Sequence, residues 1–125
     1  MFRFRKKASD ERPDAIRLVT TESELTSVVD GDLSVVYKHS SRCGISLRAL
    51  KEIRRFSRDH PRLGVAMIDV IGSRELSDLI EERFDIRHES PQAIVLRRGQ
   101  PTWDASHLSV TAAALEAATA PPDDE

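Results

Sequence analysis

Cysteine is almost absent from this sequence: Cys43 is the only one among 125 residues. A single cysteine cannot form an internal disulfide or supply the thiolates of a multi-cysteine zinc site. Long apolar runs are also missing, which argues against a membrane-spanning helix. The 19 basic and 21 acidic side chains leave a formal charge of only -2. The sequence therefore has neither the basic excess of many nucleic-acid-binding proteins nor the charge excess of disordered chains.

The residues that are present describe an ordinary globular domain. Hydrophobic residues make up 39% of the chain and charged residues 32%, a mixture that predicts one domain with a buried core. We expect a flexible polar N-terminal arm over residues 1–14, the domain over 15–118 and a flexible acidic tail over 119–125. No apolar segment follows the basic residues near the N-terminus, so we expect a cytoplasmic protein, in which a lone thiol stays reduced.

Hydrophobic periodicity predicts strands and helices in the order βαβαβαββα. Helices between successive strands imply a largely parallel central sheet, and the last two strands form an antiparallel hairpin. The predicted fold class is α/β, with a mixed sheet and helices on both faces. A thioredoxin-like three-layer fold has this order, and other open α/β sheets share it. The expected strands cover 15–19, 33–37, 64–70, 92–96 and 101–105, and the expected helices cover 21–29, 44–58, 73–84 and 110–118, with Thr21, Ser73 and Ser109 as N-terminal caps.

Cys43 lies between a predicted buried strand and the start of a predicted amphipathic helix. The carboxyl edge of a parallel sheet is where α/β proteins place their sites, and free N–H groups at a helix N-terminus favour a thiolate. Arg42 and His39 are neighbouring candidate cations. We therefore expect a reactive thiol whose pKa lies below that of free cysteine. The alternative is a buried cysteine that acts as a small hydrophobic residue, although its polar neighbours are not core residues.

Ser46 stands one helical turn after Cys43, at the position where a dithiol motif carries its second cysteine. A serine cannot resolve a mixed disulfide, so a redox site here is a one-cysteine site that needs an external thiol. The Ser46 hydroxyl can donate a hydrogen bond to the sulfur, or it can simply cap the first turn of the helix.

Three segments together carry a family resemblance. Residues 37–46 read Tyr-Lys-His-Ser-Ser-Arg-Cys-Gly-Ile-Ser, residues 88–92 read His-Glu-Ser-Pro-Gln, and residues 103–107 read Trp-Asp-Ala-Ser-His. The chain resembles the monothiol bacilliredoxins of the bacillithiol system, of the bacilliredoxin C or general-stress type. The resemblance extends from about Ile16 to Ala118, and the first two segments are specific only as a pair.

The resemblance implies a thioredoxin-like fold and a thiol–disulfide oxidoreductase that removes bacillithiol from protein mixed disulfides. Cys43 would be the nucleophile, and bacillithiol would be a co-substrate rather than a bound cofactor. The implied partners are bacillithiolated client proteins and bacillithiol, with no nucleic acid or membrane. The resemblance also places a loop proline opposite the nucleophile at Pro91, so the Ser90–Pro91 bond is expected to be cis. Gly44 departs from the family, whose members often carry proline there.

Further residues near these motifs are candidate ligand-binding groups. Bacillithiol carries carboxylates on its malate unit, so Arg42, and less strongly Arg87, are candidate partners for them. The alternative for each arginine is a solvated surface charge, and for His39 and His88 it is a hydrogen-bonded position in a loop. The expected thiolate-supporting residues are Arg42, Gly44, Ser46 and His39, and the expected ligand-binding residues are His88, Ser90, Pro91 and Gln92.

Two other functions are compatible with the sequence. Residues 43–46 read Cys-Gly-Ile-Ser, one residue away from the Cys-Gly-Phe-Ser motif of monothiol glutaredoxins, which share an iron–sulfur cluster with glutathione. Other parts of the glutaredoxin pattern are missing. The second alternative is a thioredoxin-like binding module with an idle cysteine. No metal site is expected, because His39 and Cys43 alone do not make a closed zinc site.

Overall fold

The computed structural model describes residues 14–121, and its elements follow the predicted βαβαβαββα order. Residues 1–13 of the expected arm and 122–125 of the expected tail lie outside the described residues. The strands are β1 (Ile16–Leu18), β2 (Leu33–His39), β3 (Gly64–Asp69), β4 (Gln92–Arg97) and β5 (Gln100–Ser106), and the helices are α2 (Glu22–Val29), α3 (Gly44–Asp59), α4 (Arg74–Phe84) and α5 (Ala112–Thr119), with a short 3-10 turn, η1 (His107–Ser109), before α5.

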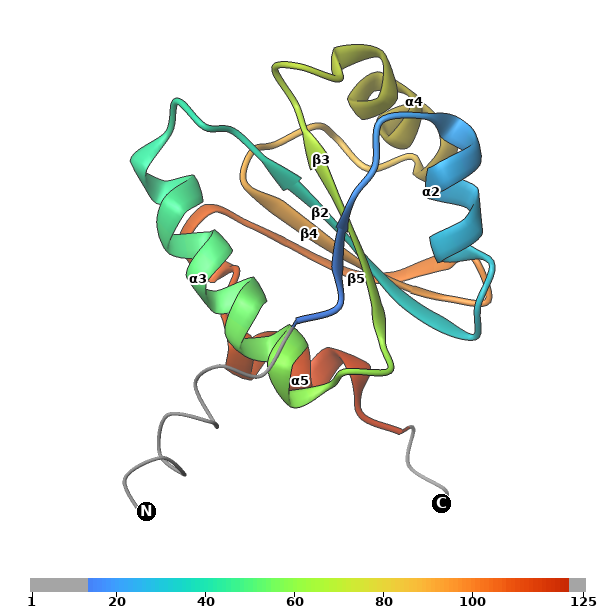
Figure 1. Ribbon diagram of the computed structural model, residues 1–125, viewed down its shortest axis with the longest axis vertical. Helices are drawn as coiled ribbons and strands as arrows, with labels where there is room; N and C mark the ends of the chain where they lie inside the picture. The colour runs from blue at the N-terminus through green and yellow to red at the C-terminus, as the bar shows by residue number, and fades with distance from the viewer. Residues whose placement is uncertain (1–13, 122–125) are drawn as a thin grey trace, which may run out of the picture.

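The five strands form one mixed sheet in the order β1-β3-β2-β4-β5 (Figure 1). β1 and β2 both pair with β3 in parallel, whereas β4 pairs antiparallel with β2 and with β5. The sheet is therefore less parallel than the order of elements suggested. The reason is that segment 85–91 returns the chain to the edge at which β2 ends, so β4 runs back along β2 from Gln92, the partner of Lys38.

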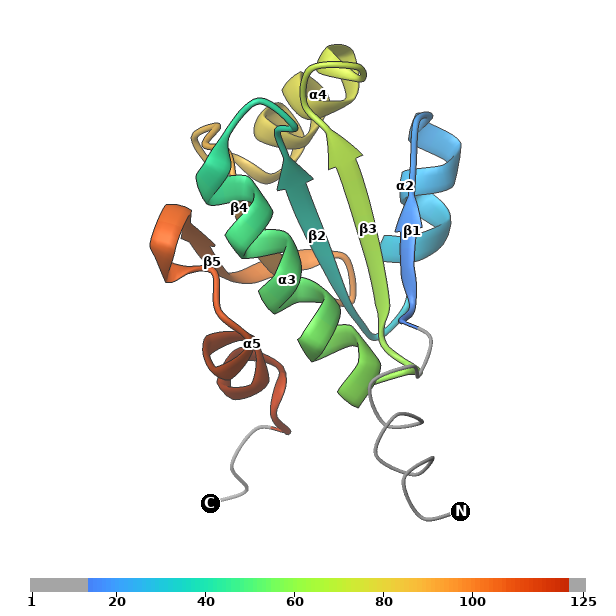
Figure 2. The ribbon, with the colours of Figure 1, turned by 60° about the vertical axis from the view of Figure 1, so that its left-hand side comes forward.

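Helices cover both faces of the sheet, as predicted: α2 and α4 lie on one face, and α3 and α5 on the other (Figures 1 and 2). Side chains of a strand alternate between its two faces, so the central strand β2 contributes Val36 to the core beneath α2 and α4. Its neighbours Val35 and Tyr37 belong to the core beneath α3 and α5. The two cores fix the position of the carboxyl edge at which β2 and β3 end.

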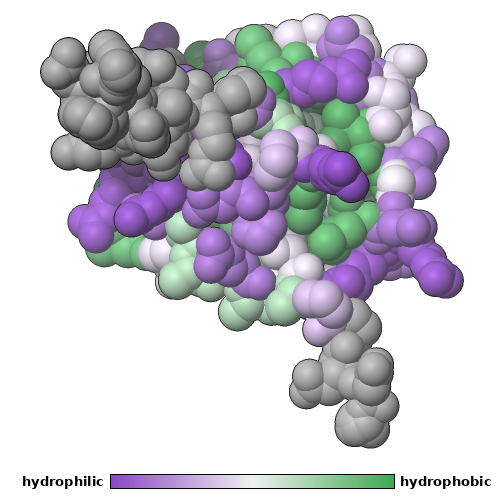
Figure 3. Space-filling view, turned by 60° about the horizontal axis from the view of Figure 1, so that its bottom comes forward, coloured by the Kyte–Doolittle hydropathy of each residue, from purple (hydrophilic) through white to green (hydrophobic). Residues whose placement is uncertain are grey.

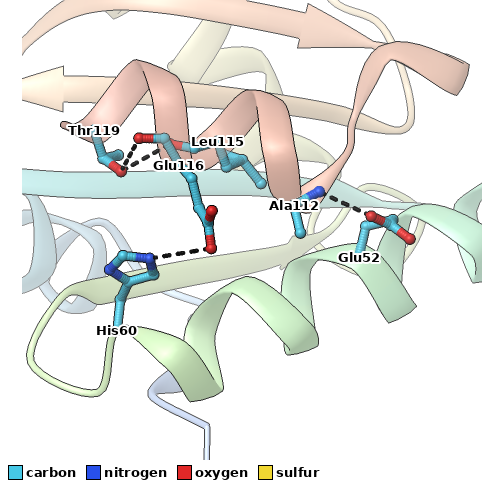
Figure 4. Close-up of polar contacts among 6 residues, drawn as sticks. All are labelled: Glu52, His60, Ala112, Leu115, Glu116 and Thr119. Carbon is cyan, nitrogen blue, oxygen red and sulfur yellow. Dashed lines mark hydrogen bonds and ion pairs between the residues drawn. The ribbon is translucent and has the colours of Figure 1, made fainter.

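Contacts between α3 and α5 complete the second layer (Figure 4). The backbone N–H of Ala112 donates to the Glu52 carboxylate at 2.8 Å, which satisfies one of the free N–H groups in the first turn of α5. His60 Nε2 lies 3.7 Å from the Glu116 carboxylate. The long helix that follows Cys43 is thus braced along its length by the last helix of the domain.

Two of the three predicted N-terminal caps are confirmed in position, and one is wrong. Thr21 caps α2, because its hydroxyl accepts the Glu24 N–H at 3.1 Å. Ser73 is the N-cap residue of α4, although its side chain makes no capping hydrogen bond. Ser109 is part of the 3-10 turn, and Thr111 caps α5 instead. The last helix therefore starts two residues later than the expected 110.

The end of β2 also differs from the prediction, with a consequence for the site. The sequence placed Lys38 and His39 in a polar loop, but both continue the strand because they pair with Ile68 and Asp69 of β3. Strand geometry then sends the two side chains to opposite faces of the sheet. Lys38 becomes fully buried, an unusual environment for a lysine.

Candidate active site around Cys43

Cys43 is the N-terminal cap of α3, in the loop that leaves the carboxyl edge of the sheet after β2 (Figure 2). Its backbone is extended, with φ -116° and ψ 122°, and the residue is half-buried. The sulfur makes no capping hydrogen bond of good geometry. Even so, the N–H groups of Ser46 and then of Ile45 favour the thiolate and lower the pKa of Cys43. The direction agrees with the sequence-based expectation, and its cause is the helix N-terminus.

Ser46 is fully buried and holds the active-site loop to the helix. Its hydroxyl oxygen accepts the Ser40 N–H at 3.2 Å, and the Ser40 carbonyl accepts the Cys43 N–H at 3.2 Å. Because the oxygen of Ser46 already serves as an acceptor, its O–H proton is available for the sulfur, and this hydroxyl further lowers the pKa of Cys43. Of the two roles that the sequence left open, the structure favours the one toward the sulfur, because the hydroxyl accepts an N–H from the loop and not from the first turn of α3.

Tyr37 is a residue of this site that the sequence reasoning missed. Its phenolic O–H donates to the Ser46 carbonyl at 3.1 Å, and its oxygen lies 2.9 Å from His39 Nδ1. A carbonyl only accepts, so the tyrosine proton goes to Ser46 and His39 donates from Nδ1. Burial, with a smaller contribution from Cys43, raises the pKa of Tyr37, so the phenol stays protonated. No motif signals this role, because the residue reads as an apolar member of a buried strand.

His39 therefore supports the start of α3 through its contact with Tyr37, rather than acting as a cation beside the sulfur. Burial is the main cause that lowers the pKa of His39, which favours the neutral ring at pH 7. Arg42 is exposed and lines a neighbouring cavity. Gly44 is the first residue of α3 and has open space where a side chain would begin. The structure thus has room for the side chain that the family resemblance led us to expect at this position.

The Ser90–Pro91 peptide bond is cis, which confirms the expectation drawn from the family resemblance. Pro91 is buried directly before β4, and its carbonyl accepts the His107 N–H at 2.9 Å. The Gln92 side chain is also buried and donates to the Arg87 carbonyl at 3.0 Å. These residues lie at the carboxyl edge because Gln92 pairs with Lys38, near the end of β2.

A cavity of about 530 Å³ opens beside the active-site loop. It collects Arg42 and His88 from the predicted set, but the side chain of Arg87 does not line it. His88 Nδ1 lies 3.3 Å from the Ser77 hydroxyl, and the His88 N–H donates to the Glu81 carboxylate at 3.1 Å. Ser77 and Glu81 also line the cavity, together with Val70, Ile71, Arg74 and Asp78, and the sequence had marked none of these six as site residues.

A larger depression of about 720 Å³ lies at the opposite end of the sheet, remote from Cys43. It is lined by residues such as Val28, Leu33 and Leu63, and Figure 3 views the molecule from this end, where hydrophobic and hydrophilic surfaces meet. Size alone does not identify the chemical site, because Cys43 does not line this larger depression. Among residues 14–121 we find no cluster of three or more histidine, cysteine or acidic side chains that could hold a metal ion. The same residues include no helix long and apolar enough to cross a membrane.

Solved structures of thioredoxin-like proteins share this fold. One protein described as having a thioredoxin fold matches with a TM-score of 0.79 and 26% identity, over 83% of this chain and 93% of its own. Thioredoxin from Malassezia sympodialis matches with a TM-score of 0.68 and 18% identity, over 86% and 90% of the two chains. Thioredoxin from Trypanosoma brucei brucei matches with a TM-score of 0.69 and 16% identity, over the same shares. The three-layer architecture is thus that of the thioredoxin fold.

The family follows from the sequence match. Residues 17–115 match the family described as Monothiol bacilliredoxin BrxC. That region contains the thiol at the start of α3, the buried Ser46 beneath it and the cis-proline loop before β4. The chain belongs to the monothiol bacilliredoxin family, and its single cysteine is placed for thiol redox chemistry.

Proposed function

We propose that this protein is a monothiol oxidoreductase that removes bacillithiol from protein mixed disulfides. The observation that carries the proposal is Cys43 itself. Its half-buried thiol stands at a helix N-terminus that lowers its pKa, and the chain has no second cysteine to resolve an intermediate. A lowered pKa increases the thiolate fraction at neutral pH, and the thiolate is the attacking species.

The reaction has two balanced thiol–disulfide exchanges. In the first, the Cys43 thiolate attacks the bacillithiol sulfur of a mixed disulfide, a new S–S bond forms, and the client protein leaves as a thiolate. In the second, the thiolate of another bacillithiol attacks the bacillithiol sulfur of the Cys43 adduct. Oxidised bacillithiol leaves as a disulfide and the Cys43 thiolate is regenerated, so bacillithiol is a co-substrate and no bound cofactor is needed.

The surrounding residues form two groups, one that acts on the Cys43 thiolate and one that faces the bacillithiol ligand. Ser46 and the first turn of α3, which starts at Gly44, stabilise the thiolate when Cys43 is the attacking or the leaving group. His88, Ser90, Pro91 and Gln92 lie on the ligand side, at the edge where β4 begins. We place the reaction in the cytoplasm, where a lone thiol stays reduced between turnovers.

The test is to mix the purified protein with a bacillithiolated client and follow both products by mass spectrometry. We expect free client thiol and a Cys43 adduct heavier by one bacillithiol, with turnover when bacillithiol is added. Cys43→Ser should abolish both products, whereas Ser41→Ala, a change at an exposed position in the same loop, should leave them intact. If the wild-type protein forms neither product, the proposal is refuted. Colour and dimerisation after reconstitution with iron, sulfide and a small thiol would favour the glutaredoxin-like alternative instead.

A further inference from the structure

Three buried polar atoms without hydrogen-bond partners gather at the carboxyl edge of the sheet. They are Lys38 Nζ, Ser90 Oγ and Gln92 Oε1, and only Ser34 Oγ shares this condition elsewhere in the described part of the chain. Lys38 and Gln92 are direct partners across β2 and β4, so their side chains leave the sheet on the same face. Because buried polar groups in proteins are nearly always paired, the cluster indicates groups that await a partner.

Lys38 is the most unusual of the three, because its side chain is fully buried. Strand alternation places it on the face opposite Tyr37 and His39, which is the face that α4 covers. Burial lowers its pKa to about 8, while the charges of Glu81 and Asp78 on α4 and of Glu89 oppose that change. A pKa near 8 leaves most of the side chains charged at pH 7. The fold therefore keeps a cation behind α4 without giving it a hydrogen bond.

This cation lies behind the cavity beside the active-site loop. Glu81 and Asp78, whose charges act on Lys38, both line the cavity, and so does His88, whose own pKa Lys38 lowers after the larger effect of burial. Arg42 lines the same cavity and is the chain neighbour of Cys43, so the cavity lies beside the loop that carries the thiol. Lys38 does not line the cavity, and its charge acts on it through the lining residues Asp78, Glu81 and His88. Its volume of about 530 Å³ is typical of a small-molecule site.

The charges of the cavity are mixed, and this narrows the class of ligand. Arg42 and Arg74 line the cavity and can bind carboxylates. The buried charge of Lys38 adds to the attraction for an anion, whereas Asp78 and Glu81 can bind an ammonium group. Bacillithiol has a malate dicarboxylate at one end and a cysteinyl ammonium group beside its thiol. We propose, on the basis of the function proposed above, that the malate unit binds in this cavity and that Lys38 is its buried cation.

The subsite would decide which sulfur Cys43 attacks. A mixed disulfide offers two sulfur atoms, and attack on the client sulfur would release bacillithiol and leave the client bound to Cys43. A bacillithiol unit held by its malate beside Arg42 presents its own sulfur to Cys43, so the client is the group that leaves. Loss of the subsite should thus change the identity of the Cys43 adduct as well as the rate.

The first test is calorimetric titration of the Cys43→Ser protein with S-methyl bacillithiol, which binds without exchange chemistry. In this background Arg74→Gln should weaken binding about tenfold, the value of one charge-assisted hydrogen bond. Lys38→Met should also weaken binding, because it removes the buried positive charge behind the cavity. Arg55→Gln is the matched control, because Arg55 is exposed on α3 and outside the cavity. Arg74 is also exposed, so its substitution tests the cavity even if Lys38→Met fails to fold.

The second test uses the active protein with a bacillithiolated client peptide. The wild-type protein should form the Cys43–bacillithiol adduct, while Lys38→Met and Arg74→Gln should shift the product toward the Cys43–peptide disulfide. Esterifying both malate carboxylates should slow the wild-type protein about tenfold and the variants much less. The subsite is overturned if the Cys43→Ser protein does not bind S-methyl bacillithiol. It is also overturned if both variants keep the wild-type affinity, the wild-type adduct and the wild-type sensitivity to esterification. Failure of the wild-type protein to release any client would refute the proposed function alone, because the titration still reports on the cavity.

Discussion

Replacing Lys38 by methionine is expected to stabilise the unliganded protein at neutral pH. The wild-type side chain is fully buried, and its Nζ has no hydrogen-bond partner. Burial lowers the pKa of Lys38 from 10.5 to about 8. Methionine is also unbranched and flexible, so it can occupy the same space without a charge. A charge retained at a cost to stability is what we expect of a group kept for a ligand.

The expected gain follows from the two pKa values of Lys38. As the pH falls from 10.5 to about 8, the unfolded chain binds a proton at Lys38 before the folded chain does, so the folded state loses stability across this interval. The loss is complete below pH 8. The difference between 10.5 and 8 is about 2.5 pH units, which corresponds to about 3 kcal/mol. Allowing for solvent screening, we expect Lys38→Met to recover about 1–3 kcal/mol at pH 7.

Urea unfolding of both proteins at pH 7 and pH 10 measures this effect. The variant should be the more stable protein at pH 7, and most of its advantage should disappear at pH 10, where wild-type Lys38 is largely neutral in the folded state. Arg55→Met, which removes an exposed charge, should show no such pH-dependent gain. If Lys38→Met is destabilised at pH 7, or if its advantage is equal at both pH values, then the buried ammonium group is adequately solvated and the reasoning fails.

Three further predictions concern the site and its supports. The alkylation rate of Cys43 should rise with pH, and its midpoint should lie below that of a free thiol, about 8.5. Ser46→Ala should move this midpoint upward because the hydroxyl lowers the pKa of the thiol. A midpoint unchanged by the substitution would contradict that role. Tyr37→Phe removes the hydrogen bond to the Ser46 carbonyl and should lower the free energy of unfolding in urea by about 1 kcal/mol. Because this bond holds the start of α3, the variant should also alkylate Cys43 more slowly. Glu52→Ala removes the acceptor of the Ala112 N–H and should cost about 1 kcal/mol, whereas equal stability would mean that water replaces the carboxylate.

The sequence by itself determined the order of the elements and the place of the nucleophile. Apolar periodicity is a local property, so strands and helices could be assigned from it, and the helix that starts after Cys43 follows from the spacing of its apolar residues. The sequence alone also excluded a dithiol cycle, because residue 46 is a serine and the chain has no second cysteine. The family resemblance supplied the cis bond before Pro91, which the structure confirms.

Only the tertiary structure decided how the site is assembled. The end of β2 depends on pairing with β3, so Lys38 and His39, which read as loop residues, became strand residues on opposite faces of the sheet. Because of that alternation, His39 lies on the same face as Tyr37 and contacts its hydroxyl. Lys38 is buried on the opposite face, behind the cavity. Arg74 lines the cavity together with Arg42 because α4 packs over the same edge. Contacts between residues far apart in the chain leave no local pattern, and for that reason the sequence could locate the thiol but not the cavity beside it.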